Sequence, residues 1–300
     1  MAAECGQQHE SDETQVGDLP EVCLALAIAL TSPRDAARCA AVSPAFRAAA
    51  DSDHVWGRFI PTSRSLPLLQ QLPRSNSKAA YLGLCDAGAV VDDGDGGGGG
   101  PVRAWLEKAT GARCYALSAR RLSLPWDDGE FCWRFKPHPL SRRFAEVAEL
   151  VECTCLDIYG RLPAAALTPA TPYAAYLVYG TVEGRRRGLS FPDQEASVAV
   201  GGRVVARHAV CLCPDEAEAR KFRAGGAVAG GAGAAVRQPR RRDDGWWEME
   251  MGRFRLADDD DKDDATDGEE AVVTANFEVM GWYPKRGLVV EAMEFRPLRG

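Results

Sequence analysis

Histidine is scarce in this sequence, with four residues in 300. This scarcity leaves little material for histidine-based catalysis or for a histidine-rich metal site. Long apolar runs are missing as well, because no segment approaches the ~20 residues that a membrane span requires. Residues 1–17 are acidic and lack the apolar stretch of a secretory signal. We therefore expect no membrane partner, and a cytoplasmic or nuclear location in which the ten cysteines stay reduced.

An excess of positive charge is also absent. The chain carries 36 Lys and Arg against 43 Asp and Glu, a net charge of -7. This balance excludes a general affinity for nucleic acid, so we expect no nucleic-acid partner. Part of the acidity is local, since residues 257–270 are mostly Asp and Glu. Such a run is too polar to bury, and we expect it to form a disordered loop.

Changes in composition divide the chain into four parts. Residues 1–17 are polar and are expected to be disordered, whereas residues 18–62 have the spacing of short helices. Residues 63–101 suit a linker that is partly helical and rich in glycine. From residue 102 to 300 the pattern changes to short β-type runs separated by Gly and Pro turns. We therefore predict a multidomain α + β protein, with three N-terminal helices before an all-β sandwich or jelly-roll.

The helical part has more apolar surface than it can bury. Ser32 is a predicted N-cap with Pro33 and Asp35 in the first turn, and Ser43-Pro44 starts another helix. About 45 residues of short helix cannot hide all of the large apolar side chains in this part. These side chains are Leu19, Val22, Leu26, Ile28, Val42, Phe46 and Trp56. Some of this surface should meet a partner, the alternative being that it packs on the C-terminal domain.

Two tryptophans flank a predicted turn. Trp126 and Trp133 are seven residues apart across Asp127-Asp128-Gly129. Their rings can fill the core, which is the usual role of large aromatic residues. They can also form an apolar platform for the flat face of a sugar ring. The first of these interpretations is the one that the residue types favour.

The N-terminal part resembles an F-box. The resemblance is carried by L-P-E at 19–21, P-R-D at 33–35, V-S-x-x-F-R at 42–47 and S-D-x-V-W-x-x-F-x-P at 52–61. It implies docking on the Skp adaptor of an SCF-type (Skp–cullin–F-box) ubiquitin ligase. The residues that it assigns to this interface, or to the layer just beneath it, are Leu19, Pro20, Val22, Pro33, Val42, Phe46 and Trp56.

The C-terminal part is similar to the phloem protein 2 family, which includes the Nictaba-like plant lectins. The matching segments are W-L-E-K-x-T-G at 105–111, L-S-A-R-R-L-S-L-P-W at 117–126, S-R-R-F-A-E-V-A-E-L at 141–150, L-D-I-Y-G at 156–160, T-P-Y-A-A-Y-L-V-Y at 171–179, R-x-D-G-W-W-E-M-E-M-G-x-F at 242–254 and K-R-G-L-V-V-E-A-M-E-F-R-P at 285–297. With the F-box ahead of it, the whole chain resembles a plant F-box protein of the phloem-protein-2-B type.

This second resemblance implies a lectin-like sandwich that binds N-acetylglucosamine oligomers or glycan cores. The family's two binding tryptophans fall on Trp126 and Trp133, and an acidic binding residue falls near Glu278. The chain departs from the family pattern at Pro125, Cys132, Phe135 and Cys155. Three of these departures, at positions 132, 135 and 155, remove aromatic surface close to the platform.

Three further groups of residues could have either a functional role or a purely structural one. Cys153-x-Cys155 and Cys211-x-Cys213 could hold zinc, but four buried reduced thiols suit the spacing better. Arg185–Arg187 and Arg240–Arg242 could bind phosphate, although solvated loop tips are the favoured interpretation. Glu248 and Glu250 lie on one face of a strand, whereas hydrolytic carboxylates oppose each other across a cleft. We see no catalytic constellation and expect no cofactor and no resident metal.

The function expected from these resemblances is recruitment of a substrate. The helices would bind the Skp adaptor of a complex that also holds a cullin, and the sandwich would select a target protein through its polypeptide or its glycans. One alternative is a carbohydrate-binding, lectin-like protein that acts without a ligase. Another is a receptor for proteins alone, which the departures near Trp133 favour.

Overall fold

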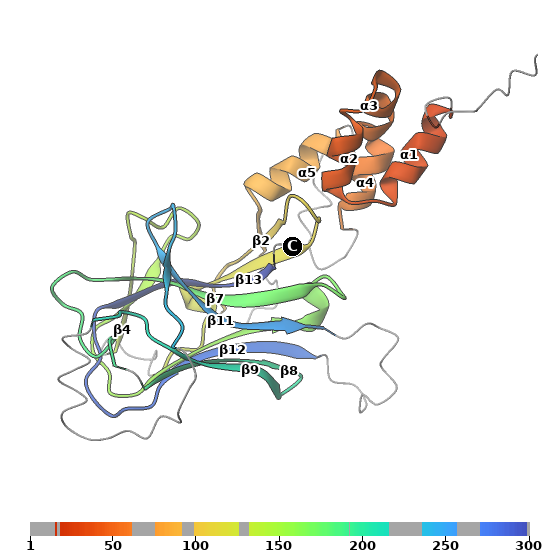
Figure 1. The fold of residues 1–300 in the computed structure, drawn as a ribbon. Coiled ribbons are helices and arrows are strands. Elements are labelled where there is room, and N and C mark those ends of the chain that lie inside the picture. Colours follow the sequence, from red (N-terminus) through yellow and green to blue (C-terminus); the bar gives the residue numbers. More distant parts are fainter. Residues whose placement is uncertain are drawn as a thin grey trace, which may run out of the picture. The chain divides into compact units, whose positions relative to one another are not determined.

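The computed structural model describes residues 16, 19–61, 76–91, 99–125, 132–191, 193–215, 236–256 and 271–298 (Figure 1). The chain divides into two units. The helical unit comprises residues 1–62, 71–82 and 108–111, and the sandwich unit comprises residues 63–70, 83–107 and 112–300. The segments predicted to be disordered, 1–17 and 257–270, lie outside the described residues except for Val16.

Five α-helices occur in the described part of the chain. They are α1 (Glu21–Ala29), α2 (Pro33–Cys39), α3 (Pro44–Ala50), α4 (Asp53–Phe59) and α5 (Ser77–Asp86). The predicted cap of α2 is confirmed, since the Ser32 hydroxyl accepts a hydrogen bond from the Asp35 N–H at 3.1 Å. The Ser43 hydroxyl caps α3 in the same way, accepting from the Phe46 N–H at 3.2 Å. No helix among the described residues is long and apolar enough to cross a membrane.

The prediction of three N-terminal helices was one helix short. Residues 18–62 contain α1 to α4 in the described part, because the segment after Ser52 continues as helix α4. Asp53 occupies the first turn of α4, where a carboxylate is favourable, and Trp56 and Phe59 lie three residues apart on its buried side. The segment 63–101, predicted as a partly helical linker, contains helix α5 in its described part, together with the strand β1 (Ala89–Val91), which was not predicted.

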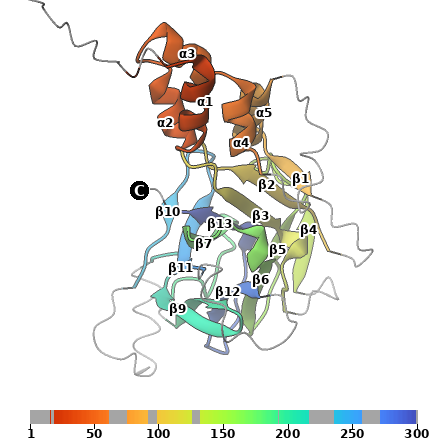
Figure 2. The same ribbon diagram turned by 90° about the vertical axis from the view of Figure 1, so that its right-hand side faces the viewer.

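Two antiparallel sheets make up the sandwich unit. One has nine strands within the described residues and follows the order β1-β2-β3-β13-β7-β11-β10, with β5 pairing both β13 and β4. The other has the order β6-β12-β8-β9 (Figures 1 and 2). The strands beyond β1 are β2 (Val102–Leu106), β3 (Arg113–Ser118), β4 (Trp133–Lys136), β5 (Val147–Leu150), β6 (Leu156–Pro163), β7 (Pro172–Thr181), β8 (Gln194–Val200), β9 (Arg203–Val210), β10 (Arg240–Arg241), β11 (Trp247–Arg255), β12 (Val272–Val279) and β13 (Leu288–Pro297).

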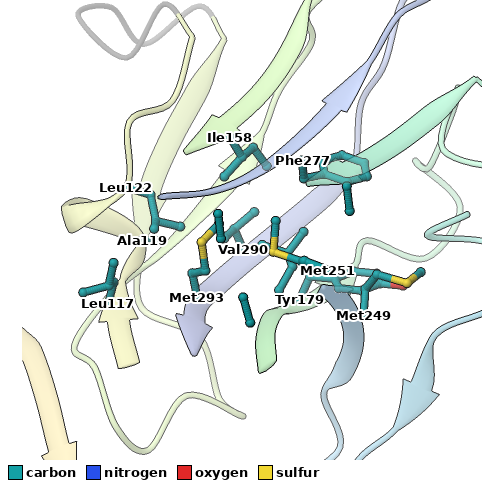
Figure 3. Close-up of a cluster of buried hydrophobic side chains, with 14 of the residues drawn as sticks. Leu117, Ala119, Leu122, Ile158, Tyr179, Met249, Met251, Phe277, Val290 and Met293 are labelled. Atoms are coloured by element: carbon teal, nitrogen blue, oxygen red, sulfur yellow. The ribbon is translucent and has the colours of Figure 1, made fainter. Parts of the chain in front are cut away.

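The main apolar core lies between the two sheets. Ile158 and Phe277 enter it from the four-stranded sheet, and Leu117 and Met293 enter it from the nine-stranded sheet (Figure 3). Alternating residues of β12 point into this layer, since buried and half-buried positions alternate along this strand from Val273 onward. The predicted β-sandwich is therefore confirmed, and the remaining question is what its outward faces carry.

The short β-type runs of the sequence predict one strand over residues 122–126 and another over 147–158, and the structure interrupts both. A short 3-10 helix at Ala119–Arg121 precedes the first run, of which only Ser123 makes a bridge in the described part, to Tyr159. The run 147–158 splits into β5 and β6, which belong to different sheets. Residues 151–155, which connect β5 to β6, contain no Gly or Pro, so no turn signal marks the change of sheet.

Replacing Gly252 by alanine should destabilise the sandwich. Gly252 lies on β11 at a register shift, and an added Cβ would stand 2.8 Å from Cβ of Ala206 and 2.9 Å from Cγ2 of Val198 on the opposite sheet. Overpacking of this kind lowers the free energy of unfolding by about 1–3 kcal/mol. Gly83→Ala is the matched control, because the same methyl group meets nothing within 4 Å outside its own helix backbone. Chemical denaturation should show that Gly83→Ala is neutral or slightly stabilising, and equal stability of Gly252→Ala and the unchanged chain would contradict the close contact.

Candidate functional sites on the helical unit and the sandwich

Helix α1 is apolar on two opposite sides. Leu24 and Ile28 are buried on the side that packs against α3 and α4. Val22, Leu26 and Leu30 recur every four residues on the other side, with exposed fractions of 70%, 50% and 80%. We call these three residues the apolar stripe. Packing inside the helical unit therefore buries only part of the apolar surface of α1.

The other residues assigned to the adaptor surface differ in exposure. Leu19, Pro20 and Val42 are exposed, and Phe46 is half-buried. Pro33 is buried at the first position of α2. These values give the exposure of the residues, and their assignment to an adaptor interface stays a prediction.

Trp56 is a core residue of the helical unit. Its Nε1 donates a hydrogen bond to the carbonyl of Ala50 at 2.7 Å, and its ring centroid lies 5.8 Å from that of Phe59 and 5.2 Å from that of Tyr81. Lys78 places its Nζ 5.3 Å from the Trp56 ring centroid. Trp56 thus holds the helices together beneath the surface and offers no face of its own to a partner.

A small cavity opens beside the apolar stripe. Its volume is about 260 Å³. It is lined by Glu21, Val22, Ala25, Leu26, Ser52 and His54. A hollow next to exposed apolar side chains is the kind of place where a partner inserts an anchoring side chain.

Trp133 does not form the predicted platform. It lies in β4, only 2% exposed, within the main core. Its Nε1 donates to the carbonyl of Pro125 at 3.0 Å, and its strand partner is Leu150. The core interpretation therefore holds for Trp133, whose ring offers no face to a sugar in this structure. Trp126 lies outside the described residues.

Glu278 stands in a row of three carboxylates on the outward face of the four-stranded sheet. The strand register places it directly opposite Asp157 on β6 and Glu195 on β8. Burial, followed by the charges of Glu195 and Asp157, raises the pKa of Glu278. Burial also raises the pKa of Asp157, while Glu195 has Arg207 at 3.2 Å. Carboxylates in such a row can accept hydrogen bonds from the hydroxyls of a sugar.

The most exposed large apolar side chain in the described part of the chain was not predicted from the sequence. Trp282 is 81% exposed in the connection between β12 and β13. The residues around it are anchored: the Tyr283 hydroxyl donates to Asp193 at 2.6 Å, and the ring of Tyr283 meets Phe191 at a centroid distance of 4.5 Å. An exposed ring on a fixed loop is prearranged to stack on a ligand. The signal in the sequence was the W-Y pair beyond Glu278, where no core periodicity continues.

Lys285 anchors the same loop through hydrogen bonds to backbone carbonyls. It is completely buried, and its Nζ donates to the carbonyls of Thr154 at 2.8 Å and Tyr283 at 3.1 Å, and to that of Gly281. Burial lowers the pKa of the Lys285 ammonium. The three carbonyl acceptors compensate for the loss of water, so this cation has a structural role.

The two Cys-x-Cys pairs occupy places suited to small apolar side chains. Cys153, Cys211 and Cys213 are buried and Cys155 is half-buried, none of them in a disulfide. Burial raises the pKa of the Cys153 thiol to about 12. The described residues contain no group of three or more His, Cys, Asp or Glu side chains that could hold a metal ion. These positions agree with the interpretation of the cysteines as core residues.

Glu248 and Glu250 are each engaged by arginines. Glu248 accepts from Arg240 at 2.6 Å and from Arg296 at 2.7 Å, and Glu250 accepts from Arg253 at 2.8 Å. They are neighbours on one strand and do not form the opposed carboxylate pair of a glycoside hydrolase.

A helical unit with an exposed apolar stripe, followed by an antiparallel sandwich whose outward faces carry groups of charged side chains, defines a protein of two structural parts. Comparison with protein families identifies the family of the sandwich unit. The model of the family described as "Phloem protein 2" matches residues 112–297, and the chain belongs to this family.

Relatives match along almost the whole chain. F-box protein PP2-B10 of Arabidopsis thaliana is 32% identical over 290 residues, which cover 97% of each chain. F-box protein PP2-B15 of the same plant is 33% identical over 291 residues, covering 93% of this chain and 96% of the relative. Among solved structures, a family 35 carbohydrate binding module from Clostridium thermocellum aligns with 61% of this chain and 96% of its own, at 9% identity and a TM-score of 0.31.

Glu278→Gln should change the pH dependence of stability. The pKa of Glu278 is raised in the folded state. The stabilisation that this carboxyl group gives to the folded state is therefore fully present below its unfolded pKa of ~4.3 and is lost as the pH rises through its folded pKa. Glutamine removes this loss, so the variant should be more stable than the unchanged chain at pH 7, by about 0.5 kcal/mol for one relieved cross-strand pair. The difference should vanish near pH 4. Thermal unfolding at both pH values measures it.

The control for this comparison is Glu183→Gln, which alters an exposed carboxylate in a turn. It should show no difference that depends on pH. A stability of Glu278→Gln that stays below that of the unchanged chain at pH 7 would refute the assigned repulsion.

Proposed function

We propose that this chain is a substrate-recognition subunit of an SCF-type ubiquitin ligase, in which the helical unit binds the Skp adaptor and the sandwich unit binds the target. The observation that carries the proposal is the apolar stripe of Val22, Leu26 and Leu30. Fully burying one such side chain stabilises a complex by roughly 1.5–3 kcal/mol. The relatives reported above carry the name F-box protein, which agrees with this assignment.

The stripe has the form of a helix that docks in an apolar groove. Docking of this kind uses side chains spaced three or four residues apart on one helix face. Val42 adds a further exposed apolar side chain directly before the Ser43 cap of α3, and the cavity beside Leu26 can receive an anchor from the partner. In this proposal the role of the surface is recruitment.

Adaptor capture tests this proposal. Val22→Asp with Leu26→Asp should lower the affinity for an immobilised Skp adaptor more than about tenfold, because two charges would have to be desolvated. Val204→Asp with Val205→Asp is the matched control, since it makes the same kind of change at two exposed positions of β9. The control should bind like the unchanged chain. Failure of the unchanged chain to bind any Skp adaptor would remove the proposal.

Carbohydrate binding by the sandwich unit is the second candidate function, and the exposure of Trp282 favours it. A sugar presents a C–H face that stacks on an aromatic ring and hydroxyls that bond to polar groups nearby. Glu278 lies four residues before Trp282, a chain separation of at most ~14 Å. In this proposal Trp282 stacks on the ring and Glu278 bonds to its hydroxyls, whether the sugar is free or attached to a target protein.

Titration with N-acetylglucosamine oligomers tests the second function. Trp282→Ala should weaken binding by about tenfold or more, because stacking on an aromatic face is lost. Met280→Ala, which removes an exposed but non-aromatic side chain from the same loop, should leave binding within about twofold. Trp126→Ala is included to test the resemblance-based site. Binding that responds to Trp126→Ala and not to Trp282→Ala would move the site to the tryptophan that the family pattern names.

A further inference from the structure

A polar cavity of about 710 Å³ opens on the outward side of the nine-stranded sheet. It lies entirely within the sandwich unit. Its cations come from four strands and two connecting segments: Arg103, Arg143, Arg240, Arg242, Arg253 and Arg296. Three acids also line it: Asp86, Glu107 and Glu294. The lining therefore favours an anionic ligand over a cationic or neutral one.

The arginines rest on buried carboxylates. Glu248, Glu291 and Glu294 are only 1–4% exposed. Arg143 pairs with Glu291 at 2.5 Å and also with Glu294. Arg296 pairs with Glu248 at 2.7 Å and with Glu294 at 3.3 Å. Because the acids lie beneath and the guanidinium groups are more exposed, an incoming ligand meets the cations first.

The network holds the guanidinium groups in fixed orientations. Arg242 bonds at the same time to Asp244, Glu248 and Glu294. Burial by itself would raise the pKa of Glu294, but the neighbouring Arg143, Arg296 and Arg242 hold it below its ordinary value. A guanidinium that is already oriented loses little side-chain entropy when it binds an anion.

Donors remain after these pairs are formed. Arginine has five N–H groups, and the carboxylates engage only part of them. The Nη1 groups of Arg240, Arg253 and Arg296 donate to no acceptor among the described residues. Three partly used guanidinium groups at one cavity supply the donors that an oxyanion requires.

Arg103 has no carboxylate partner in the described structure. Its one hydrogen bond there runs from Nη2 to the carbonyl of Ala87. Burial and the charge of Arg143 lower the pKa of Arg103, and the charge of Glu291 offsets part of this effect. An anion in the cavity would add to that compensation.

Aromatic side chains complete the wall. Trp105 and Tyr176 line the same cavity. The guanidinium carbon of Arg296 lies 3.9 Å from the centroid of the Tyr176 ring. This stacking positions Arg296 further, and the rings offer apolar surface to whatever group carries the anion.

We propose that this cavity binds a phosphate monoester, with the oriented arginines on the phosphate and the aromatic wall on the group that carries it. A phosphate dianion has three terminal oxygens and suits several guanidinium forks at once, whereas a carboxylate has only two oxygens. The volume exceeds what a bare phosphate needs and leaves room for a sugar or an amino-acid side chain. The sequence interpretation of Arg240–Arg242 as solvated loop tips is wrong for Arg242, which is largely buried. The site is made of sandwich residues and does not depend on adaptor binding by the helical unit.

Calorimetric titration of the full chain at pH 7.5 and low salt tests the proposal. The probes are N-acetyl-phosphoserine amide, glucose 6-phosphate and inorganic phosphate, which are mostly dianions at this pH. The neutral counterparts are N-acetylserine amide and glucose. The phosphorylated probes should bind and the neutral ones should not. Tighter binding of the phosphoserine probe would indicate a phosphorylated protein segment, and tighter binding of the other two would indicate a free metabolite.

Arg103→Gln combined with Arg253→Gln should weaken binding of the phosphorylated probes about tenfold or more. This pair leaves no buried carboxylate unpaired, because Glu250 keeps Arg237 at 2.8 Å. Arg203→Gln with Arg255→Gln is the matched control, since it removes the same charge from exposed strand positions outside the cavity. The control should bind within about twofold of the unchanged chain.

Three results would overturn the proposal. They are no binding of any phosphorylated probe by the unchanged chain, equal binding of the neutral probes, or an equal loss of affinity in the control pair. If the test pair fails to fold, Arg240→Gln replaces it. Arg240 is 77% exposed, and Glu248 keeps its bond to Arg296 without it. An unchanged affinity in folded Arg240→Gln then counts against the site.

Discussion

Strand β13 has to bury both of its faces, and the architecture of the sandwich follows from this constraint. It pairs with β3, β5 and β7, and all but one of its ten residues are buried. Val290 and Met293 both point into the core although they are three residues apart, which a regular strand would not allow. A register shift between Val290 and Ala292 accommodates the extra residue, Glu291. The bulge thus lets one strand serve the apolar core on one side and a polar network on the other.

The polar network is the consequence of placing carboxylates on a doubly buried strand. Glu291 and Glu294 cannot be left as isolated charges away from water. Arg143, Arg242 and Arg296 converge on them from a connecting loop, the end of β10 and β13 itself. Such a network gives little net stability compared with an apolar core, but it fixes its members in space. The guanidinium groups are fixed in orientation and keep N–H groups that the carboxylates do not use, and these N–H groups are the donors in the proposed anion site.

The helical unit leaves part of its apolar surface exposed. Its helices are short, and alanines such as Ala36 and Ala49 allow them to approach closely around Trp56. A core made of small side chains buries little apolar area, so the large residues of α1 cannot all enter it. Val22 and Leu26 remain outside for this reason, and an incoming protein can cover them. The small size of the unit and its exposed apolar stripe therefore have the same physical cause.

The sequence by itself determined the division into a helical and a β part, the caps at Ser32 and Ser43, the alternation of β12 and the excess of apolar residues on α1. These features depend on neighbours along the chain, and local patterns encode them directly. Only the tertiary structure decided that Trp133 is buried while Trp282 is exposed, and that arginines distant in sequence meet at one cavity. The reason is that burial and ion pairing depend on which strands become neighbours, and the pairing of β13 with β3 and β7 joins segments more than a hundred residues apart.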